Sequence, residues 1–254
     1  MNKNAYKNGL SSFIKLLDES GQLIRIKEKV SIDQEIAEIS DRIMKSGSGG
    51  KAILFENTGT DFPVLINSFG SRQRIDKVFA TTKPESVFTD LFELAKDLSE
   101  SGKSFRTISK LWRERSLLKV FPKKINGKAA CQQNIIKNPD LKKLPVLQSW
   151  PFDGGPFFTL PSVFTNHPKT NVKNIGMYRM QVFDHETTGM HWHRHKGGAE
   201  HYNEYKKAGV KMPVAVALGG DPLLTYLATA PLPDGIDELL MYGLIRRKPA
   251  KMTK

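Results

Sequence analysis

One stretch of this sequence constrains the fold more than any other. It runs from Asn174 to Lys196 as N-I-G-M-Y-R-M-Q-V-F-D-H-E-T-T-G-M-H-W-H-R-H-K. Residues 176–183 are apolar, aromatic and β-branched, residues 184–189 have the composition of a turn, and residues 190–195 resume the strand pattern. Two such runs around a short polar segment predict a β-hairpin.

The second strand of this hairpin carries an unusual set of side chains. Because side chains alternate across a strand, His191, His193 and His195 would share one face, while Trp192 and Arg194 would take the other. A hairpin that only packs a core does not normally carry so many polar and cationic groups. The pattern therefore indicates a site for an anion or a metal ion.

The composition limits the functions that such a site can serve. The chain has 254 residues, 39% of them hydrophobic, which predicts a folded protein of one large domain or two small ones. No apolar run reaches the roughly 20 residues of a membrane-spanning helix, and the N-terminus lacks the apolar core of a signal peptide. Cys131 is the single cysteine, which excludes an internal disulfide. We therefore predict a cytoplasmic protein.

The net charge of +13 favours an anionic partner. The densest basic region runs from Lys103 to Lys128, and it contains no zinc-finger spacing and no RNA-binding signature. A basic face in contact with solvent explains this region better than a nucleic-acid site does. We therefore predict no nucleic-acid partner.

Apolar spacing and turn residues divide the chain near residue 125. The first part alternates helices and strands as an α/β unit, with a helix that begins at Asp33, strands at 52–55 and 64–66, and helices at 84–98 and 105–118. The second part is richer in prolines and strands, including a strand at 129–136 and a buried strand at 213–218. Residues 1–125 and 126–254 are therefore predicted to be two domains of an α+β protein.

Three acidic residues outside the hairpin have local structural explanations. Asp153 lies in the turn W-P-F-D-G-G and is expected to bond that turn. Asp221 precedes Pro222 and is expected to cap a helix. Glu238 fits the first turn of a last helix, with Asp234 or Asp237 at its N-terminus, because the helix dipole favours a carboxylate there without any functional role.

Several metal sites are compatible with these residues. Three imidazoles on one strand face could bind zinc, but alternate strand residues lie about 7 Å apart, so one straight strand rarely supplies three ligands. One or two of these histidines with ligands from elsewhere is geometrically easier. Asn174 offers an amide oxygen and Glu238 a carboxylate, and an oxygen-rich set with one imidazole suits Mn²⁺ or Mg²⁺ better than Zn²⁺.

Arg179 has two interpretations of equal weight. It either forms a structural ion pair or binds a carboxylate or phosphate through two parallel N–H groups. The chain contains no G-x-S-x-G and no G-x-G-x-x-G, so the familiar hydrolase and dinucleotide motifs do not decide between them.

Several long segments together resemble a known family. The segments N-I-G-M-Y-R-M-Q-V, H-W-H-R-H-K-G-G-A, P-V-A-V-A-L-G-G-D-P, A-P-L-P-D-G-I-D-E and L-P-V-L-Q-S-W-P-F-D-G-G-P-F-F-T-L-P are similar to those of the UbiD-type decarboxylases. These enzymes use prenylated flavin mononucleotide (prenylated FMN) to remove carboxylate from aromatic or unsaturated acids. The likeness covers nearly the whole chain, and M-H-W-H-R-H-K resembles the branch linked to quinone biosynthesis, especially menaquinone.

The resemblance implies roles for particular residues. Asn174, His195 and Glu238 match the family's metal ligands, and the metal, usually manganese, bridges to the flavin phosphate. Arg179 matches the catalytic arginine that holds the substrate carboxylate. The residues that match cofactor-contacting segments are Met177, Tyr178, Arg179, His191, Trp192, His193, Lys196 and Gly197. The second domain would be a split β-barrel that binds the flavin.

The resemblance also implies a function and partners. It predicts non-oxidative decarboxylation of an aromatic acid, such as a hydroxybenzoate or hydroxynaphthoate used as a quinone precursor. Family members continue past Lys254, so the barrel is expected to be incomplete, and the chain alone is not expected to decarboxylate. The alternative is a non-catalytic flavin- or metal-binding module, or one subunit that a second chain completes. The expected partners are the acid substrate, further copies of the chain or a complementing C-terminal chain, and the inner face of the cell membrane.

Overall fold

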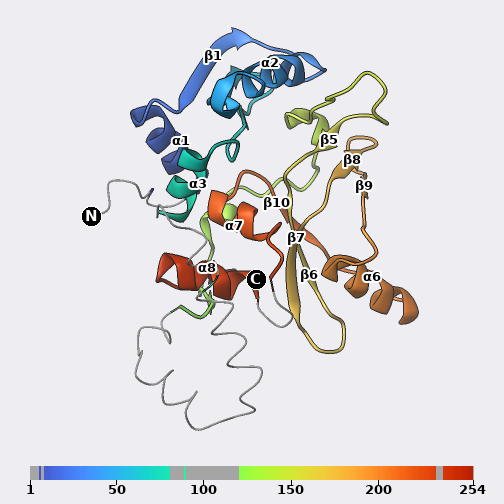
Figure 1. The fold of residues 1–254 in the computed structure, drawn as a ribbon. Helices are drawn as coiled ribbons and strands as arrows, with labels where there is room; N and C mark the ends of the chain where they lie inside the picture. Colours follow the sequence, from blue (N-terminus) through green and yellow to red (C-terminus); the bar gives the residue numbers. More distant parts are fainter. Residues whose placement is uncertain (1–5, 7–8, 81–88, 90–119, 233–236, 254) are drawn as a thin grey trace.

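The structure is a computed structural model that describes residue 6, residues 9–80, residue 89, residues 120–232 and residues 237–253 (Figure 1). Apart from residue 89, the helices predicted at 84–98 and 105–118 lie outside this part of the chain. The described helices are α1 (Gly9–Glu19), α2 (Glu35–Met44), α3 (Arg72–Phe79), α6 (Gly197–Lys207), α7 (Pro222–Leu227) and α8 (Glu238–Arg246). The described strands are β1 (Leu23–Lys29), β2 (Ala52–Asn57), β3 (Val64–Ile66), β4 (Lys123–Lys124), β5 (Phe157–Phe158), β6 (Ser162–Asn166), β7 (Lys173–Met177), β8 (Met180–Val182), β9 (Thr188–Met190), β10 (Ala215–Ala217) and β11 (Lys251–Met252).

The first part of the chain forms a small sheet covered by helices. Strands β1 and β2 are parallel and α2 connects them, while β3 returns antiparallel to β2. The spacing of isoleucines places Ile36 of α2 in the core, where it packs with Ile53 and Phe55 of β2. The predicted helix and the strands at 52–55 and 64–66 are therefore confirmed.

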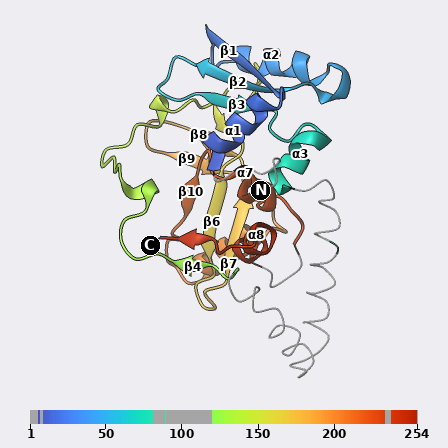
Figure 2. The same ribbon diagram turned by 90° about the vertical axis from the view of Figure 1, so that its left-hand side faces the viewer.

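Helices α1, α3, α7 and α8 share one apolar core. Its fully buried members include Phe13 of α1, Val78 of α3, Leu223 and Leu227 of α7, and Met241 of α8. Both views place α7 between the N-terminal helices and the sheet that contains β6 and β7, and α8 next to α7 (Figures 1 and 2). This arrangement carries the first residue of α8 to the side of β7.

Asp221 ties three distant segments together. As predicted, its side chain caps α7 by accepting a hydrogen bond from the Leu223 N–H at 3.0 Å. It also accepts hydrogen bonds from the hydroxyls of Tyr6 and Tyr242 and from Nη2 of Arg246. The Arg246 guanidinium lies 4.2 Å from the centre of the Tyr6 ring. Asp221 therefore links the N-terminal segment, α7 and α8 through one carboxylate.

The predicted hairpin is only partly correct. The first strand breaks at Tyr178 and Arg179, because β7 pairs with β6 in one sheet and β8 pairs with β5 and β9 in another. β8 and β9 do form a hairpin, but β9 ends at Met190 and the chain then turns towards α6. The expectation that three histidines share one strand face is therefore wrong, since the residues that carry them have left the strand.

Two other strand predictions also differ from the structure. Residues 129–136 contain a short 3₁₀ helix at Ala130–Gln132 in place of a strand, and the Gln132 side chain accepts a hydrogen bond from the Ala129 N–H. Residues 213–218 do contain a strand, β10, but it lies at the edge of its sheet. Two side chains of this segment, Val214 and Val216, are 39% and 38% exposed rather than buried.

The α+β fold class is confirmed by this mixture of helices and small sheets. The second part builds two three-stranded sheets, β10-β6-β7 and β5-β8-β9. The division into domains near residue 125 stays a prediction. Within the described ranges, no helix has both the length and the apolarity that a bilayer crossing requires.

Candidate metal centre

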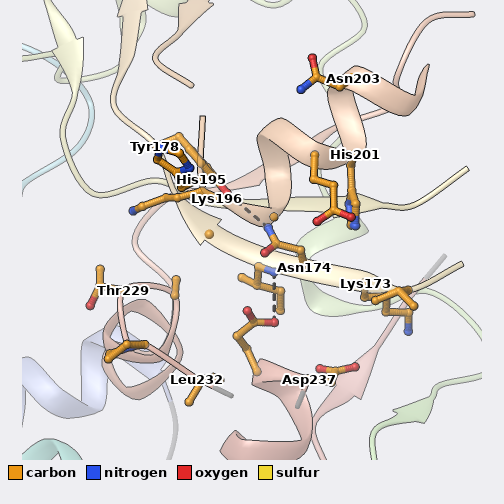
Figure 3. Close-up of a pocket in the computed structure, with 18 of the residues that line it drawn as sticks. Lys173, Asn174, Tyr178, His195, Lys196, His201, Asn203, Thr229, Leu232 and Asp237 are labelled. Atoms are coloured by element: carbon orange, nitrogen blue, oxygen red, sulfur yellow. Dashed lines mark hydrogen bonds between the residues drawn. The ribbon is translucent and has the colours of Figure 1, made fainter. Parts of the chain in front are cut away.

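A cavity of about 1070 Å³ lies between β7, α6, the segment 228–232 and the start of α8 (Figure 3). All three predicted metal ligands, Asn174, His195 and Glu238, line this cavity. They come from three separate elements, because Asn174 is on β7, His195 is in the turn before α6, and Glu238 is the first residue of α8. The fold therefore brings together residues that the sequence separates widely.

The amide of Asn174 is oriented by its neighbours. Its Nδ2 donates to the hydroxyl of Tyr178 at 3.5 Å, so Oδ1 is directed away from that tyrosine. Oδ1 lies close to the N-terminus of α6, since a Cβ added to Gly197 would approach it to 2.5 Å. Any side chain at Gly197 would therefore have to displace the Asn174 amide oxygen.

Glu238 lines the cavity from the start of α8. Asp237 caps α8 by accepting from the Leu239 N–H at 2.6 Å, as expected for one of the two candidate caps. One oxygen of Glu238, Oε2, accepts a hydrogen bond from the Ile175 N–H on β7 at 3.2 Å. Burial raises the pKa of Glu238 to about 7. A carboxyl group in this position favours a cation that would compensate the lost hydration.

Tyr178 and Trp192 shape the N-terminus of α6. Tyr178 is 2% exposed, and its hydroxyl accepts a hydrogen bond from the Gly198 N–H at 2.9 Å. Its ring packs on Trp192 with the ring centres 4.8 Å apart. A Cβ on Gly198 would lie 2.5 Å from Trp192 and 2.7 Å from the Tyr178 hydroxyl. These two aromatic residues therefore hold the start of α6 against β7.

The cavity wall at the start of α6 is suited to an anion. Lys196 is the N-cap residue of α6 and lies with His195 beside the cavity (Figure 3). In the first turn of α6 the Gly198 N–H donates to Tyr178, and the N–H groups of Ala199 and Glu200 donate to the Lys196 carbonyl. The Lys196 ammonium group and the positive end of the helix dipole are therefore what favours phosphate at this wall.

Five of the predicted site residues lie outside this cavity wall. Met177 packs with the apolar cluster of Ile175 and Ala228, and Trp192 packs on Tyr178. His191 and His193 lie on the chain between β9 and α6, with their rings stacked at 5.3 Å and nearly parallel. Arg179 is also absent from the wall, because it follows Tyr178 at the point where the chain passes from one sheet to the other.

Arg179 is held on the side of the β5-β8-β9 sheet. Its Nη2 forms an ion pair with Oδ1 of Asp153 at 3.0 Å, and its guanidinium carbon lies 3.6 Å from the centre of the Phe157 ring. The expectation that Asp153 only builds its turn misses this contact. No feature of the local sequence indicates it, since the two residues meet through the pairing of β5 with β8.

Sequence reasoning also missed His201. Its side chain lines the cavity from α6 and is 4% exposed, with Nδ1 2.9 Å from Oγ1 of Thr165 on β6. Burial lowers the pKa of His201, so the ring is neutral near pH 7. His201 follows Gly197 by four residues, which is about one helical turn, and this spacing is the sequence signal that could have identified it.

In the described part of the chain no cluster of three or more His, Cys, Asp or Glu side chains could hold a metal ion. The proposed set of Asn174, His195 and Glu238 therefore depends on the Asn174 amide.

Family models match most of the chain. Residues 123–254 match the 3-octaprenyl-4-hydroxybenzoate carboxy-lyase Rift-related domain, UbiD, and residues 14–95 match the N-terminal domain of the same family. A protein of Archaeoglobus fulgidus is 42% identical over 253 residues, which cover 98% of this chain and 51% of that protein. The chain spans about half the length of the first curated relatives that it matches.

Two of the proteins that this chain resembles are named as decarboxylases or parts of one. A Chlamydia pneumoniae protein, named as a subunit of 4-hydroxybenzoate decarboxylase, is 38% identical over 235 residues, covering 91% of this chain and 38% of that protein. The vanillic acid decarboxylase of Sedimentibacter hydroxybenzoicus, in closed form, has a TM-score of 0.79 and 26% identity over 98% of this chain and 50% of that chain. The enzyme HmfF of Pelotomaculum thermopropionicum, solved in complex with prenylated FMN, has a TM-score of 0.80, 21% identity and coverage of 98% and 53%. The last likeness concerns the fold alone.

Proposed function

This chain belongs to the UbiD family of carboxy-lyases, and on that premise we propose that it provides the metal- and flavin-phosphate-binding part of a decarboxylase for an aromatic acid. One observation carries the proposal, namely that Asn174, His195 and Glu238 line a single cavity beside the N-terminus of α6. An amide oxygen, an imidazole and a carboxylate suit Mn²⁺ or another divalent cation. The neighbouring helix N-terminus suits a phosphate.

The residues present fit such a pair of ligands. The carbonyl oxygen of Asn174 is directed at the start of α6, and Glu238 is a partly buried carboxyl group without a cationic side chain among the causes that shift its pKa. A divalent cation between them would neutralise both Glu238 and a phosphate held at α6. Prenylated FMN, when bound, would supply the electron-accepting chemistry of the reaction, and the protein would supply binding and orientation.

The substrate that we propose is a hydroxybenzoate or hydroxynaphthoate used as a quinone precursor. The names of two relatives, one a part of a 4-hydroxybenzoate decarboxylase and the other a vanillic acid decarboxylase, support a hydroxylated aromatic acid. Arg179 would hold its carboxylate, because a guanidinium presents parallel N–H donors that match the two oxygens. The cofactor-contacting roles of Met177, His191, Trp192 and His193 stay predictions.

The experiment that tests this proposal measures retention of FMN, which has the same phosphate as prenylated FMN. We expect the purified chain to retain FMN through gel filtration when Mn²⁺ is present and to release it when EDTA removes the metal, because each ligand completes the site of the other. Protein-bound flavin absorbance gives the readout. Retention that is equal with and without metal would contradict the proposed site.

A matched pair of glycine substitutions controls for the geometry of this site. Gly197→Ala should lower Mn²⁺-dependent retention, because the added Cβ would displace the Asn174 amide oxygen. Gly220→Ala serves as the control, because a Cβ there meets nothing within 4 Å. Equal retention in the two variants would show that the Asn174 amide does not take part.

We further propose that a second half of the fold pairs with the edge of β10. The apolar run at 213–218 is typical of a strand covered on both faces. In the described residues β10 pairs with β6 alone, and Val214, Val216 and Leu218 are exposed. An exposed apolar edge is a template for another strand. The part of the relatives that this chain does not span would supply that strand.

The pairing can be tested by co-expression with the second half of the Archaeoglobus fulgidus relative. We expect this half to co-purify with the chain, and Val216→Lys to reduce the amount roughly tenfold, because a lysine on a strand edge opposes pairing. Val210→Lys is the matched control, since Val210 is also exposed but lies after α6, outside the sheets. Equal co-purification with both variants would exclude β10 as the contact.

A further inference from the structure

We propose that Asp153 is a positioning residue that orients Arg179 for a carboxylate ligand. The inference rests on the proposed function and deepens it, because it concerns how the substrate-binding group is held. Three observations carry it: the ion pair between the two residues, the packing of the guanidinium on Phe157, and a buried Asp153 oxygen that the turn does not use.

Two contacts fix the guanidinium of Arg179 from different directions. Asp153 meets one of its terminal nitrogens, Nη2, at 3.0 Å, and Phe157 covers one of its faces at 3.6 Å. A guanidinium has five N–H donors in a rigid plane, so one pairing at an edge leaves others available. The Arg179 side chain is 42% exposed, and Asp153 is the one acidic group that it meets in the described residues. The remaining edge can therefore receive a ligand.

The position of Asp153 is itself held by the fold. Gln181 of β8 donates from Nε2 to the Gly154 carbonyl next to Asp153. The Phe157–Gln181 and Leu147–Phe157 pairings anchor the segments on either side of this turn. The loop that carries Asp153 is thus attached to the same strand that follows Arg179, so the distance between the two residues is set by strand pairing.

Other aspartates of the chain show what a structural role looks like. Asp184 accepts from the N–H groups of Glu186 and Thr187 at 2.8 and 2.7 Å, and these bonds with that of the Thr187 hydroxyl lower its pKa to about 2. Asp221 and Asp237 cap helices through backbone N–H groups. In contrast, Oδ2 of Asp153 is buried without a hydrogen-bond partner. The fold thus does not use this oxygen for its turn.

Stability gives little reason for the arrangement. A half-exposed ion pair contributes little to folding, and a carboxylate with one unsatisfied buried oxygen loses hydration that its partner does not restore. Because Asp153 contributes little to stability, its contact with the Arg179 guanidinium beside Phe157 is better explained by its effect on the orientation of Arg179. Holding Arg179 in one orientation lowers the entropy lost when a carboxylate binds.

The test uses 4-hydroxybenzoate as the probe and this chain at low ionic strength, with binding followed by NMR titration of the arginine Nε–H signals. We expect the Arg179 signal to move on titration and Asp153→Asn to weaken binding about tenfold. This direction discriminates, because removing a negative charge would by itself strengthen the binding of an anion. Asp153→Glu, which keeps the charge, should recover part of the affinity.

Glu186→Gln is the matched control, because it removes one negative charge from the β8–β9 turn without a contact to Arg179, and it should leave affinity equal or slightly higher. Binding by Asp153→Asn that equals or exceeds the wild-type affinity would overturn the proposal, as would a wild-type Arg179 signal that does not respond to the probe. Mn²⁺-dependent FMN retention, measured on the same samples, reports the proposed function separately. If retention persists and the wild-type Arg179 signal responds to the probe, but Asp153→Asn binds as tightly as the wild type, only the role of Asp153 is refuted.

Discussion

Glu238→Gln is expected to abolish Mn²⁺-dependent retention of FMN by this chain. Glutamine preserves the shape of the side chain, and its carbonyl oxygen can still accept the hydrogen bond from the Ile175 N–H. It removes the negative charge that would offset a divalent cation. Loss of a metal ligand or of its support commonly lowers metal affinity by about 10–100-fold, and flavin should be lost in parallel because its phosphate shares the metal.

The control for this variant is Glu200→Gln. Glu200 lines the same cavity from the first turn of α6, so this change removes the same charge from the same space. It should reduce retention little or not at all, because the favoured ligand set does not include it. Unchanged flavin retention in Glu238→Gln, together with lower thermal stability, would favour the helix-dipole interpretation of Glu238 and contradict the metal site.

Asp221→Ala is expected to have the largest effect on stability. Without this carboxylate the Arg246 side chain, which is 8% exposed, becomes an uncompensated buried charge, and the hydroxyls of Tyr6 and Tyr242 lose their acceptor. Removing one partner of a buried ion pair typically costs about 3–5 kcal/mol. Denaturant unfolding followed by circular dichroism measures the free energy of unfolding.

Asp237→Ala is the matched control for Asp221→Ala. Asp237 also caps a helix through a backbone N–H, but it has no buried arginine as a partner among its hydrogen bonds in the described residues. Loss of a simple cap costs about 1 kcal/mol. Equal destabilisation by the two variants would show that Asp221 acts only as a cap and that its links to Tyr6 and Arg246 add nothing measurable.

The same carboxylate predicts a pH dependence. Burial alone would raise the pKa of Asp221, but the Tyr6 hydroxyl and the Arg246 charge together hold the pKa below its usual range. A group with a lowered pKa in the folded state stabilises the protein above its unfolded value, about 4, and this stabilisation is lost as the pH falls. Asp221→Ala should therefore reduce the difference in stability between pH 7 and pH 3.

The sequence by itself determined the features that depend on near neighbours. The isoleucine spacing of α2, the strands β2 and β3, and the cap Asp221 follow from local patterns of residues, whereas the sequence narrowed the cap of α8 only to Asp234 or Asp237. The likeness of long segments also pointed to the family that the comparisons show. The roles of the individual site residues stay predictions that the experiments above address.

Only the tertiary structure decided which distant residues meet. Apolar residues at 176–183 fit one long strand, but pairing with two different partners broke it at Tyr178 and Arg179 and sent their side chains to different surroundings. The same pairing joined Arg179 to Asp153, and the packing of α8 on β7 brought Glu238 into the cavity that Asn174 lines. Strand pairing and helix packing are set by the whole core, because the free energy comes from surfaces buried between segments far apart in sequence, which no local pattern encodes.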